Sequence, residues 1–317
     1  MMKTALIAIA KCENPYIGEW LDHHLSMGFD LIVVADNDDK MELSGFSSDK
    51  VIIKDYTKVE GVQPKAYQEL FRKYRNDYDW IFFCDIDEFL VIEDGRDVNA
   101  FLSSFPQDVD MIRLNCKHFT DNDELDVIDG NYNVFNRFLT PISVDNDRFC
   151  KSFINTSIYM SNPRIYGHGI YDDTLKSIDA EGNPCGNKKK TDKVVHKVAW
   201  VNHYRTKTIG EYMRQKYNRG GSNRNPCRYS QWEKYFFLTN TKTQEKIDYA
   251  NTYVRQNNPL NNKQDIYGKR DKTIQHRVQC RSRQCDNRRK GNSLQHRISQ
   301  QGRIPRNDTS RGSRRSD

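Results

Sequence analysis

In the stretch WIFFCDIDEFLVIEDG (80–95), an apolar run ends in carboxylates and further apolar residues follow. A strand buried on both faces of a sheet has a nearly continuous apolar sequence of this kind. Carboxylates at its end, here Asp85, Asp87 and Glu88, must be solvated, paired or bound to a cation. The pattern therefore predicts a buried strand that ends in a polar site.

Strands and helices alternate in front of this stretch. Asn14 is placed to cap a helix, Pro15 suits its first position, and apolar residues recur at helical spacing until Gly28. A second helical stripe lies at 64–75. The apolar runs that predict further strands are 4–10, 30–36 and 51–56. This β-α-β order predicts an α/β fold with a mostly parallel central sheet flanked by helices.

The second half of the chain has a weaker pattern. Strands are predicted at 109–116, 151–159 and 199–204. Thr208 and Glu211 have the spacing of a capping box, which predicts a helix that starts there and stops at Gly220. A last helix is predicted from about 230 to 256.

The charge divides the chain into two parts. Residues 261–317 hold 16 Lys and Arg against 5 Asp, whereas residues 1–260 hold 34 Lys and Arg against 38 acidic residues. The last part lacks apolar periodicity and is rich in Arg, Gln, Asn and Ser, so it cannot bury enough surface to offset the entropy of ordering. We expect one domain at 1–260 and a basic, disordered tail at 261–317.

Composition also bears on the compartment. The eight cysteines are scattered without a CxxC pair, no secretory leader is recognised, and no stretch approaches the roughly 20 apolar residues of a membrane span. We expect reduced thiols and a cytoplasmic protein, with contact to the inner face of the membrane left open.

Polar residues follow three of the predicted strands. Glu13 follows the first, Asp36 ends the second, and Asp85 and Asp87 follow the fourth. Ligands of open α/β sheets bind beyond the carboxyl ends of the strands. Alternate residues of extended backbone share a face, and carboxylate oxygens suit Mg²⁺ or Mn²⁺, which can neutralise a diphosphate. The Asp-x-Asp motif alone does not exclude a merely solvated strand end.

Several ordered blocks within residues 3–221 resemble bacterial glycosyltransferases of the family 2 type, which are associated with capsule and lipopolysaccharide synthesis. The blocks are KCENPYIGEWLDHHLSMGFDLIVVADND, QPKAYQELFRKYRNDYDWIFFCDIDEFL, KSFIN with a following HG, and NHYRTKTIGEYMRQKYNRG. The resemblance implies the nucleotide-diphospho-sugar transferase (GT-A-like) fold. It also implies a nucleotide-diphosphate sugar as donor, with a UDP-sugar favoured, and a glycan or lipid-linked acceptor.

The resemblance assigns roles to the residues at the strand ends. Asp87 would be the principal ligand of Mn²⁺ or Mg²⁺, and Asp85 would reach the ribose or share the metal. Glu13 and Asp36 would face the nucleoside. The family commonly has Asn-Glu at the first of these positions, where this chain has Cys12 before the Glu.

Further roles follow from the same resemblance. A His from the second half would be the third metal ligand, and His203 is favoured over His168. Lys65 is a candidate for the diphosphate and Lys151 for the phosphates or the acceptor. Each of these side chains has an ordinary alternative as a surface lysine or a structural histidine.

The implied chemistry is inverting transfer, in which a carboxylate takes the proton of the acceptor hydroxyl while the metal stabilises the leaving diphosphate. Asp173 or Asp172 is preferred as this base. Asp121 and Asp123 are the rivals, and the sequence does not choose among them.

The sequence leaves three other functions to consider. A phosphatase or phosphotransferase of the haloacid dehalogenase type uses Asp-x-Asp after its first strand with a small residue next, whereas Glu88 and Phe89 follow here. Nucleic-acid binding fits the pI of 8.8 but not the net negative charge of residues 1–260. A catalytically silent carbohydrate-binding protein would not need Asp85 and Asp87. The loop 179–193, rich in Gly, Asn and Lys, is expected to contact the acceptor.

Overall fold

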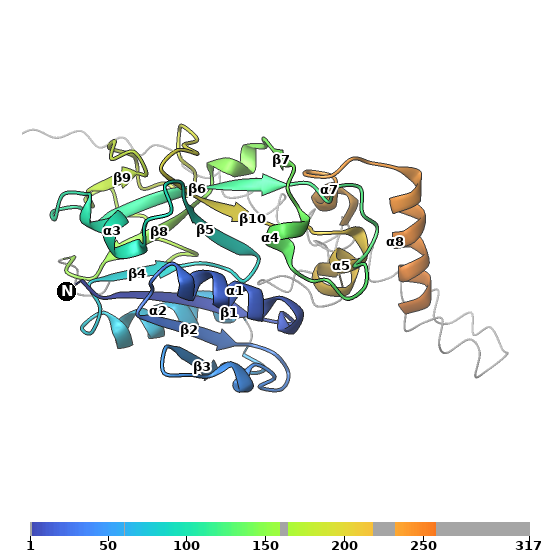
Figure 1. Cartoon of the computed structure of the whole chain (residues 1–317), viewed down its shortest axis with the longest axis horizontal. Helices are drawn as coiled ribbons and strands as arrows, with labels where there is room; N and C mark the ends of the chain where they lie inside the picture. Colours follow the sequence, from blue (N-terminus) through green and yellow to red (C-terminus); the bar gives the residue numbers. More distant parts are fainter. Residues whose placement is uncertain (1, 60, 159–163, 218–231, 258–317) are drawn as a thin grey trace, which may run out of the picture. The chain divides into compact units, whose positions relative to one another are not determined.

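A mixed β-sheet organises the chain (Figure 1). The computed structural model describes residues 2–59, 61–158, 164–217 and 232–257. The strands of this part form one ten-stranded sheet with the path β3-β2-β1-β4-β8-β6-β10-β5, to which β7 and β9 add beside β6.

The first four strands of the path are parallel. They are β1 (Thr4–Ala10), β2 (Leu31–Asp36), β3 (Val51–Asp55) and β4 (Trp80–Phe83). β1 pairs with β2 on one side and with β4 on the other, and β3 pairs with β2. The carboxyl ends of all four therefore meet at one edge of the sheet.

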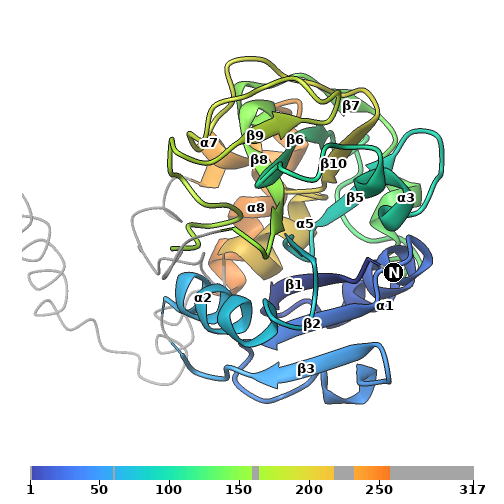
Figure 2. The same ribbon diagram turned by 90° about the vertical axis from the view of Figure 1, so that its left-hand side faces the viewer.

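Helices α1 (Asn14–Ser26) and α2 (Val62–Tyr74) cover opposite faces of this half (Figure 2). Leu6 and Ala8 of β1 pack in one apolar cluster with Trp20 of α1. Ala5 and Ile7 pack in the other cluster, which contains α2. Alternate residues of β1 thus pack in the two different cores, which is why the sequence of β1 is continuously apolar.

The second half of the sheet is mixed. Its strands are β5 (Glu88–Ile92), β6 (Met111–Phe119), β7 (Pro141–Ile142), β8 (Cys150–Asn155), β9 (Ser177–Asp179) and β10 (Ala199–His203). β8 is antiparallel to both β4 and β6, β10 is parallel to β6, and β5 is antiparallel to β10.

The sheet curls back toward its own middle. β5 lies at the far end of the path, although only residues 84–87 separate it from β4. A connection this short spans less than about 18 Å, because an extended residue covers at most about 3.6 Å. The edge strand β5 therefore returns to the end of β4, and the connecting turn lies inside the curl.

The described residues form further helices and single helical turns. They are η1 (Ser44–Phe46), α3 (Val98–Ser103), α4 (Val134–Arg137), η2 (Asp145–Arg148), α5 (Ile209–Tyr212), η3 (Met213–Tyr217), α7 (Trp232–Phe236) and α8 (Gln244–Asn257). α5, η3, α7 and α8 share a third, smaller apolar cluster. No helix of the described residues is long and apolar enough to cross a membrane.

The predicted α/β fold is confirmed, with a parallel first half and helices on both faces. The capping box is confirmed as well: Thr208 Oγ1 accepts from the Glu211 backbone N–H, and Glu211 Oε2 accepts from the Thr208 N–H. Gly220 and the predicted tail 261–317 lie outside the described residues.

Two local predictions were wrong. Asn14 does not cap α1; Glu13 holds the N-cap position but its side chain makes no capping hydrogen bond, and Asn14 Nδ2 donates to Glu42 instead. The last helix is not continuous from about 230, because α7 ends at Phe236 and α8 begins at Gln244. The Thr- and Asn-rich segment between them forms side-chain bonds that compete with a helix.

Candidate active site

The turn between β4 and β5 is fixed by helix α1. Trp20 is fully buried and its indole N–H donates to the carbonyls of Glu88 at 2.8 Å and Asp85 at 3.1 Å. The backbone N–H of Asp85 donates to Glu88 Oε2 at 2.9 Å, and that of Tyr204 donates to the Asp87 carbonyl at 2.9 Å. The Asp-x-Asp segment is therefore a turn rather than extended backbone, and its course is set by four hydrogen bonds.

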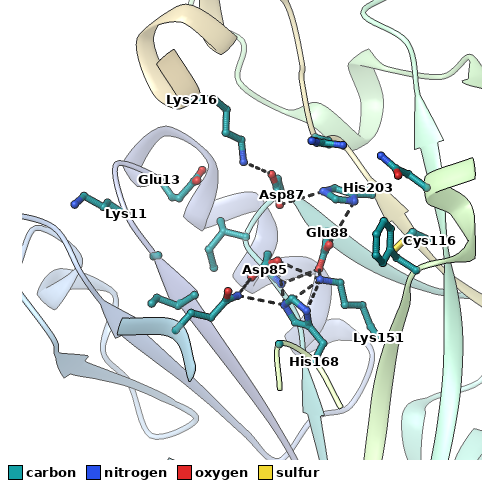
Figure 3. A pocket seen from close by; sticks show the side chains of 18 of the residues that line it. Lys11, Glu13, Asp85, Asp87, Glu88, Cys116, Lys151, His168, His203 and Lys216 are labelled. Carbon is teal, nitrogen blue, oxygen red and sulfur yellow. Dashed lines mark hydrogen bonds and ion pairs between the residues drawn. The ribbon is translucent and has the colours of Figure 1, made fainter. Parts of the chain in front are cut away.

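A cavity of about 460 Å³ lies over this turn (Figure 3). Asp85, Asp87 and Glu88 line it from the turn, while Glu13 lines it from the end of β1. Four further ionisable groups of the lining come from later strands and loops: Lys151, His168, His203 and Lys216. Strand ends from both halves of the sheet thus converge on one pocket.

Asp85 is held by partners on both carboxylate oxygens. Gln63 Nε2 donates to Oδ1 at 2.8 Å, and the Tyr67 hydroxyl lies 3.3 Å from the same oxygen. On Oδ2, Lys151 Nζ lies at 3.1 Å and His168 Nε2 at 3.0 Å. Burial raises the pKa of Asp85, but His168 and Lys151 outweigh it and hold this pKa well below its usual range.

Lys151 is the internal counter-ion of the turn. It comes from β8, is 5% exposed, and its ammonium lies 2.7 Å from Oε2 of the fully buried Glu88. Burial lowers the pKa of Lys151, yet Asp85 and Glu88 outweigh it and raise this pKa. Burial raises the pKa of Glu88, and Lys151 opposes that shift. The lysine therefore stays charged between two carboxylates.

His168 reaches Asp85 from a tight hairpin. The Tyr166 and Gly169 backbones pair with each other, and Gly167 between them has φ 58°, in the left-handed region that favours glycine. A Cβ at Gly169 would lie 3.1 Å from Ser152 Oγ, so the glycine allows the hairpin to approach β8. The GHG sequence thus positions the imidazole.

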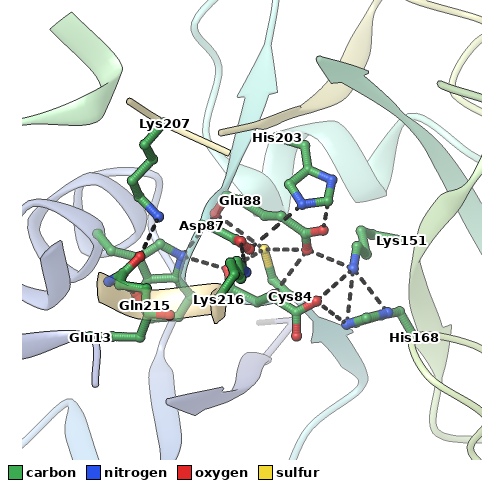
Figure 4. Close-up of polar contacts among 12 residues, drawn as sticks. Glu13, Cys84, Asp87, Glu88, Lys151, His168, His203, Lys207, Gln215 and Lys216 are labelled. Atoms are coloured by element: carbon green, nitrogen blue, oxygen red, sulfur yellow. Dashed lines mark hydrogen bonds and ion pairs between the residues drawn. The ribbon is translucent and has the colours of Figure 1, made fainter. Parts of the chain in front are cut away.

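Asp87 has a separate set of partners (Figure 4). Lys216 Nζ lies 2.7 Å from Oδ2, and His203 Nε2 lies 3.7 Å from Oδ1. The other ring nitrogen of His203, Nδ1, lies 3.4 Å from Glu88 Oε1. Burial raises the pKa of Asp87, but Lys216 and His203 outweigh it and hold this pKa below its usual range. Burial lowers the pKa of His203 and keeps its ring neutral.

These residues fit a divalent cation at Asp87. Two donors 3.7 Å apart can bind the same ion at about 2.1 Å each, and a neutral imidazole with a carboxylate suits Mn²⁺. Glu88 Oε1 is buried and accepts no hydrogen bond from the described residues, although it faces His203 Nδ1. A carboxylate behind the imidazole is the usual partner of a metal-binding histidine.

Two other groups of donors come within 4.8 Å of one another, and both fit a hard cation less well. One joins Asp85, Glu88 and His168, where the Lys151 ammonium already contacts all three. The other joins Glu88 and His203 to Cys116, whose thiol pKa is raised by burial. A protonated thiol is a poor ligand for Mg²⁺ or Mn²⁺.

No protein-family model matches this chain, and no curated protein matches it. Solved structures do. S. aureus TarS (1-349) matches 81% of this chain and 74% of its own length, with 14% identity and a TM-score of 0.35. The same protein in complex with UDP matches 49% of this chain, which spans about half of that neighbour (47%), with 15% identity and a TM-score of 0.33.

A third structure is CMP:2-keto-3-deoxy-manno-octonic acid synthetase complexed with CTP. It matches 49% of this chain and 75% of its own length, with 14% identity and a TM-score of 0.28. Values this low carry no conclusion about activity.

The remaining strand-end candidates differ in their surroundings. Glu13 is 4% exposed, lines the cavity and accepts from Gln215 Nε2 at 3.4 Å. Asp36 is fully buried, and its oxygens accept from the backbone N–H groups of Asp38 and Leu43. It does not line the cavity, whereas its neighbour Asn37 does. The structure therefore shows Asp36 shaping the loop that presents Asn37.

The other predicted residues lie outside the cavity lining. Lys65 is exposed on α2. Asp172 Oδ1 accepts from the backbone N–H and hydroxyl of Thr174, and Asp173 is exposed. Both aspartates follow Tyr171, which does line the cavity. Their roles stay predictions.

The rival bases are occupied elsewhere. Lys246 Nζ, from α8, lies 2.8 Å from Asp121 and 3.0 Å from Asp123. This lysine is 1% exposed, so the two carboxylates serve to neutralise a buried charge.

Sequence reasoning missed three residues of the segment that follows β10. Lys207 has φ 55° and is buried, with Nζ 4.4 Å from the centroid of the Tyr16 ring. Gln215 contacts Glu13, and Lys216 contacts Asp87 (Figure 4). A signal was present for Lys216, which continues the helical spacing of Ile209 and Met213. A lysine on such an apolar stripe requires an anionic partner when it is partly buried.

Proposed function

We propose that the chain is a metal-dependent glycosyltransferase of the family 2 type. It would transfer a sugar, with inversion, from a nucleotide-diphosphate sugar to a hydroxyl of a glycan or lipid-linked acceptor. The observation that carries the proposal is that Asp87, in the turn after the parallel strand β4, lies beside His203 at the end of β10 and Lys216 of η3. That grouping offers a divalent-cation site beside an ammonium group, which suits a diphosphate.

Asp87 and His203 would hold Mn²⁺ or Mg²⁺, which when bound neutralises the charge of the departing diphosphate. Glu88 orients His203 from behind, with Oε1 3.4 Å from Nδ1. Lys151 holds the carboxyl groups of Asp85 and Glu88 in place. Asp85, with both oxygens engaged, would contact the ribose or share the metal only by exchanging one of these partners.

Glu13 and Asn37 would border the nucleoside, and Asp36 would act through the loop that it holds; we propose a UDP-sugar as donor. Lys65 remains a proposed diphosphate contact. For the base, we prefer Asp173 over Asp172, since Asp172 Oδ1 already accepts twice from Thr174.

A cytoplasmic site of action next to the inner face of the membrane would give access to lipid-linked acceptors, as capsule or lipopolysaccharide synthesis requires. The phosphotransferase alternative is not favoured, because Asp85, which would be its nucleophile, has hydrogen-bonding partners on both oxygens.

Calorimetric titration of the full chain with UDP and GDP, each with and without Mn²⁺, tests the proposal. We expect one nucleotide to bind at least tenfold more tightly with Mn²⁺, and UDP is the expected one. Failure of both to bind to protein that is folded by circular dichroism would refute the transferase assignment.

Replacing Lys216 by Met is expected to strengthen Mn²⁺ binding and to slow transfer from the diphosphate sugar. Without nucleotide, Mn²⁺ should bind more tightly, because the ammonium 2.7 Å from Asp87 Oδ2 no longer competes. Transfer from a UDP-sugar should slow about tenfold to a hundredfold, since a cation beside the leaving group is lost.

Electron paramagnetic resonance of free Mn²⁺ measures the first effect independently of activity. Lys234→Met, an exposed substitution on α7, is the control. Unchanged Mn²⁺ affinity in Lys216→Met would contradict the competition.

A further inference from the structure

A buried arginine holds a lysine-rich loop at the edge of the cavity. Arg113 of β6 is 2% exposed and donates through Nη1 and Nη2 to the carbonyls of Gly186 and Lys188. At the other end of the loop, Arg148 Nε donates to the Thr191 carbonyl at 2.7 Å. A planar guanidinium that binds two carbonyls of one loop fixes the backbone there. The backbone of loop 186–191 is therefore held at both ends by arginine side chains.

The three lysines of the loop differ in whether they have an ion-pair partner. Lys190 is paired with Asp145. Lys188 and Lys189 are exposed, and neither has a carboxylate within ion-pair distance among residues 2–59, 61–158, 164–217 and 232–257. Lys189 lines the cavity, and its Nζ lies 5.2 Å from the centroid of the Phe149 ring. Residues 1–260 as a whole have a net negative charge, so the positive charge of Lys188 and Lys189 is a local feature of this loop.

Aromatic rings also line the cavity, and Asn187 of the loop donates to the carbonyl of Asp172, the residue after one of them, at 2.6 Å. Tyr171 and Phe149 both line it. Tyr171 is 38% exposed and stacks on Tyr166, which is 44% exposed, with ring centroids 6.1 Å apart and planes at 14°. Tyr166 belongs to the hairpin that carries His168 to Asp85, and Tyr171 follows this hairpin directly. Exposed flat rings next to a cavity are suited to the apolar faces of sugars.

We propose that Lys188, Lys189, Phe149, Tyr166 and Tyr171, here called the lysine–tyrosine rim, form the acceptor subsite and take an anionic glycan. A sugar ring packs on Tyr171, and its carboxylate or phosphate group is received by Lys189. This inference rests on the proposed glycosyltransferase function and specifies its acceptor class. It also extends the expectation for loop 179–193 to particular side chains.

Binding of matched glycans to the full chain tests the rim. The probes are trigalacturonate with its neutral methyl ester, and maltotriose monophosphate with unmodified maltotriose, so that the two arms distinguish carboxylate from phosphate. In calorimetry with UDP and Mn²⁺ present, we expect at least one charged probe to bind tenfold or more tightly than its neutral counterpart. Raising the salt concentration should reduce the difference.

Variants locate the effect. Lys189→Gln should lower the affinity for the charged probe about tenfold and leave the neutral probe unchanged, whereas Tyr171→Ala should weaken both. Lys50→Gln, an exposed substitution before β3, should change neither. Equal binding of charged and neutral probes, or an unaffected Lys189→Gln variant, would overturn the inference.

The same titrations separate this inference from the proposed function. Nucleotide binding with Mn²⁺ should be intact in Lys189→Gln and Tyr171→Ala. If nucleotide binds and no glycan preference is found, the rim is wrong and the transferase assignment stands. If the charged glycan binds through Lys189 and no nucleotide binds, the rim is an anionic-glycan site and the transferase assignment fails.

Discussion

Replacing Lys151 by Met is expected to lower the free energy of unfolding by about 3–5 kcal/mol, the usual cost of removing one partner from a buried ion pair. The ammonium lies 2.7 Å from Glu88 and 3.1 Å from Asp85, and Glu88 is fully buried. Methionine fills a similar volume, so the loss is mainly electrostatic: two carboxylates are left without their common counter-ion. Urea denaturation followed by circular dichroism measures it.

The double variant Lys151→Met/Glu88→Gln is the matched control. Removing the buried negative charge as well should restore part of the lost stability, because the destabilisation comes from an uncompensated charge. Lys190→Met, which breaks a partly exposed pair with Asp145, should cost less than about 1 kcal/mol. A loss below about 1 kcal/mol in Lys151→Met would show that Lys151 is not the counter-ion of the turn.

Asp87→Asn should abolish metal-dependent nucleotide binding and slow transfer about a thousandfold. Asparagine keeps the size of the side chain and removes the charge that would bind the cation, so the loss of charge stabilisation at the diphosphate sets the magnitude. The fold should tolerate the change, because the side chain of Lys216 is 24% exposed and can be solvated.

Calorimetry with UDP and Mn²⁺, together with thermal unfolding, checks both parts. Asp49→Asn, exposed in the segment before β3, is the control for a lost surface charge. Retained Mn²⁺-dependent binding in a folded Asp87→Asn variant would remove Asp87 from the metal site and leave the motif as a structural turn.

The first half of the sheet was predictable because its signals are local. Strand β1 is covered by apolar side chains on both faces, because its successive residues Leu6 and Ile7 pack in different cores. The capping box at Thr208 is equally local. Asn14 failed as a cap because its amide bonds to Glu42, a residue distant in sequence that propensity does not consider.

The sequence predicted the types of residue in the site better than it predicted which side chains contact each other. The sequence indicated that Asp85, Asp87 and a histidine belong together, and both His168 and His203 line the cavity. It did not indicate that each histidine lies beside a different aspartate. The sequence indicates Lys151 only as a phosphate candidate, because its burial between Asp85 and Glu88 depends on how β8 pairs with β4.

Because the sheet curls, residues that are far apart in the chain must meet before the cavity is complete during synthesis. Glu88 pairs with His203 in the β5–β10 ladder, and Asp87 meets Lys216, which is 129 positions later in the chain. At about 5–20 residues per second, a ribosome needs roughly 6 to 26 s to add this intervening chain. During that interval the nascent N-terminal half exposes the unpaired edge of β5, so the Asp87–Lys216 ion pair and the full cavity lining cannot form before residue 216 has emerged.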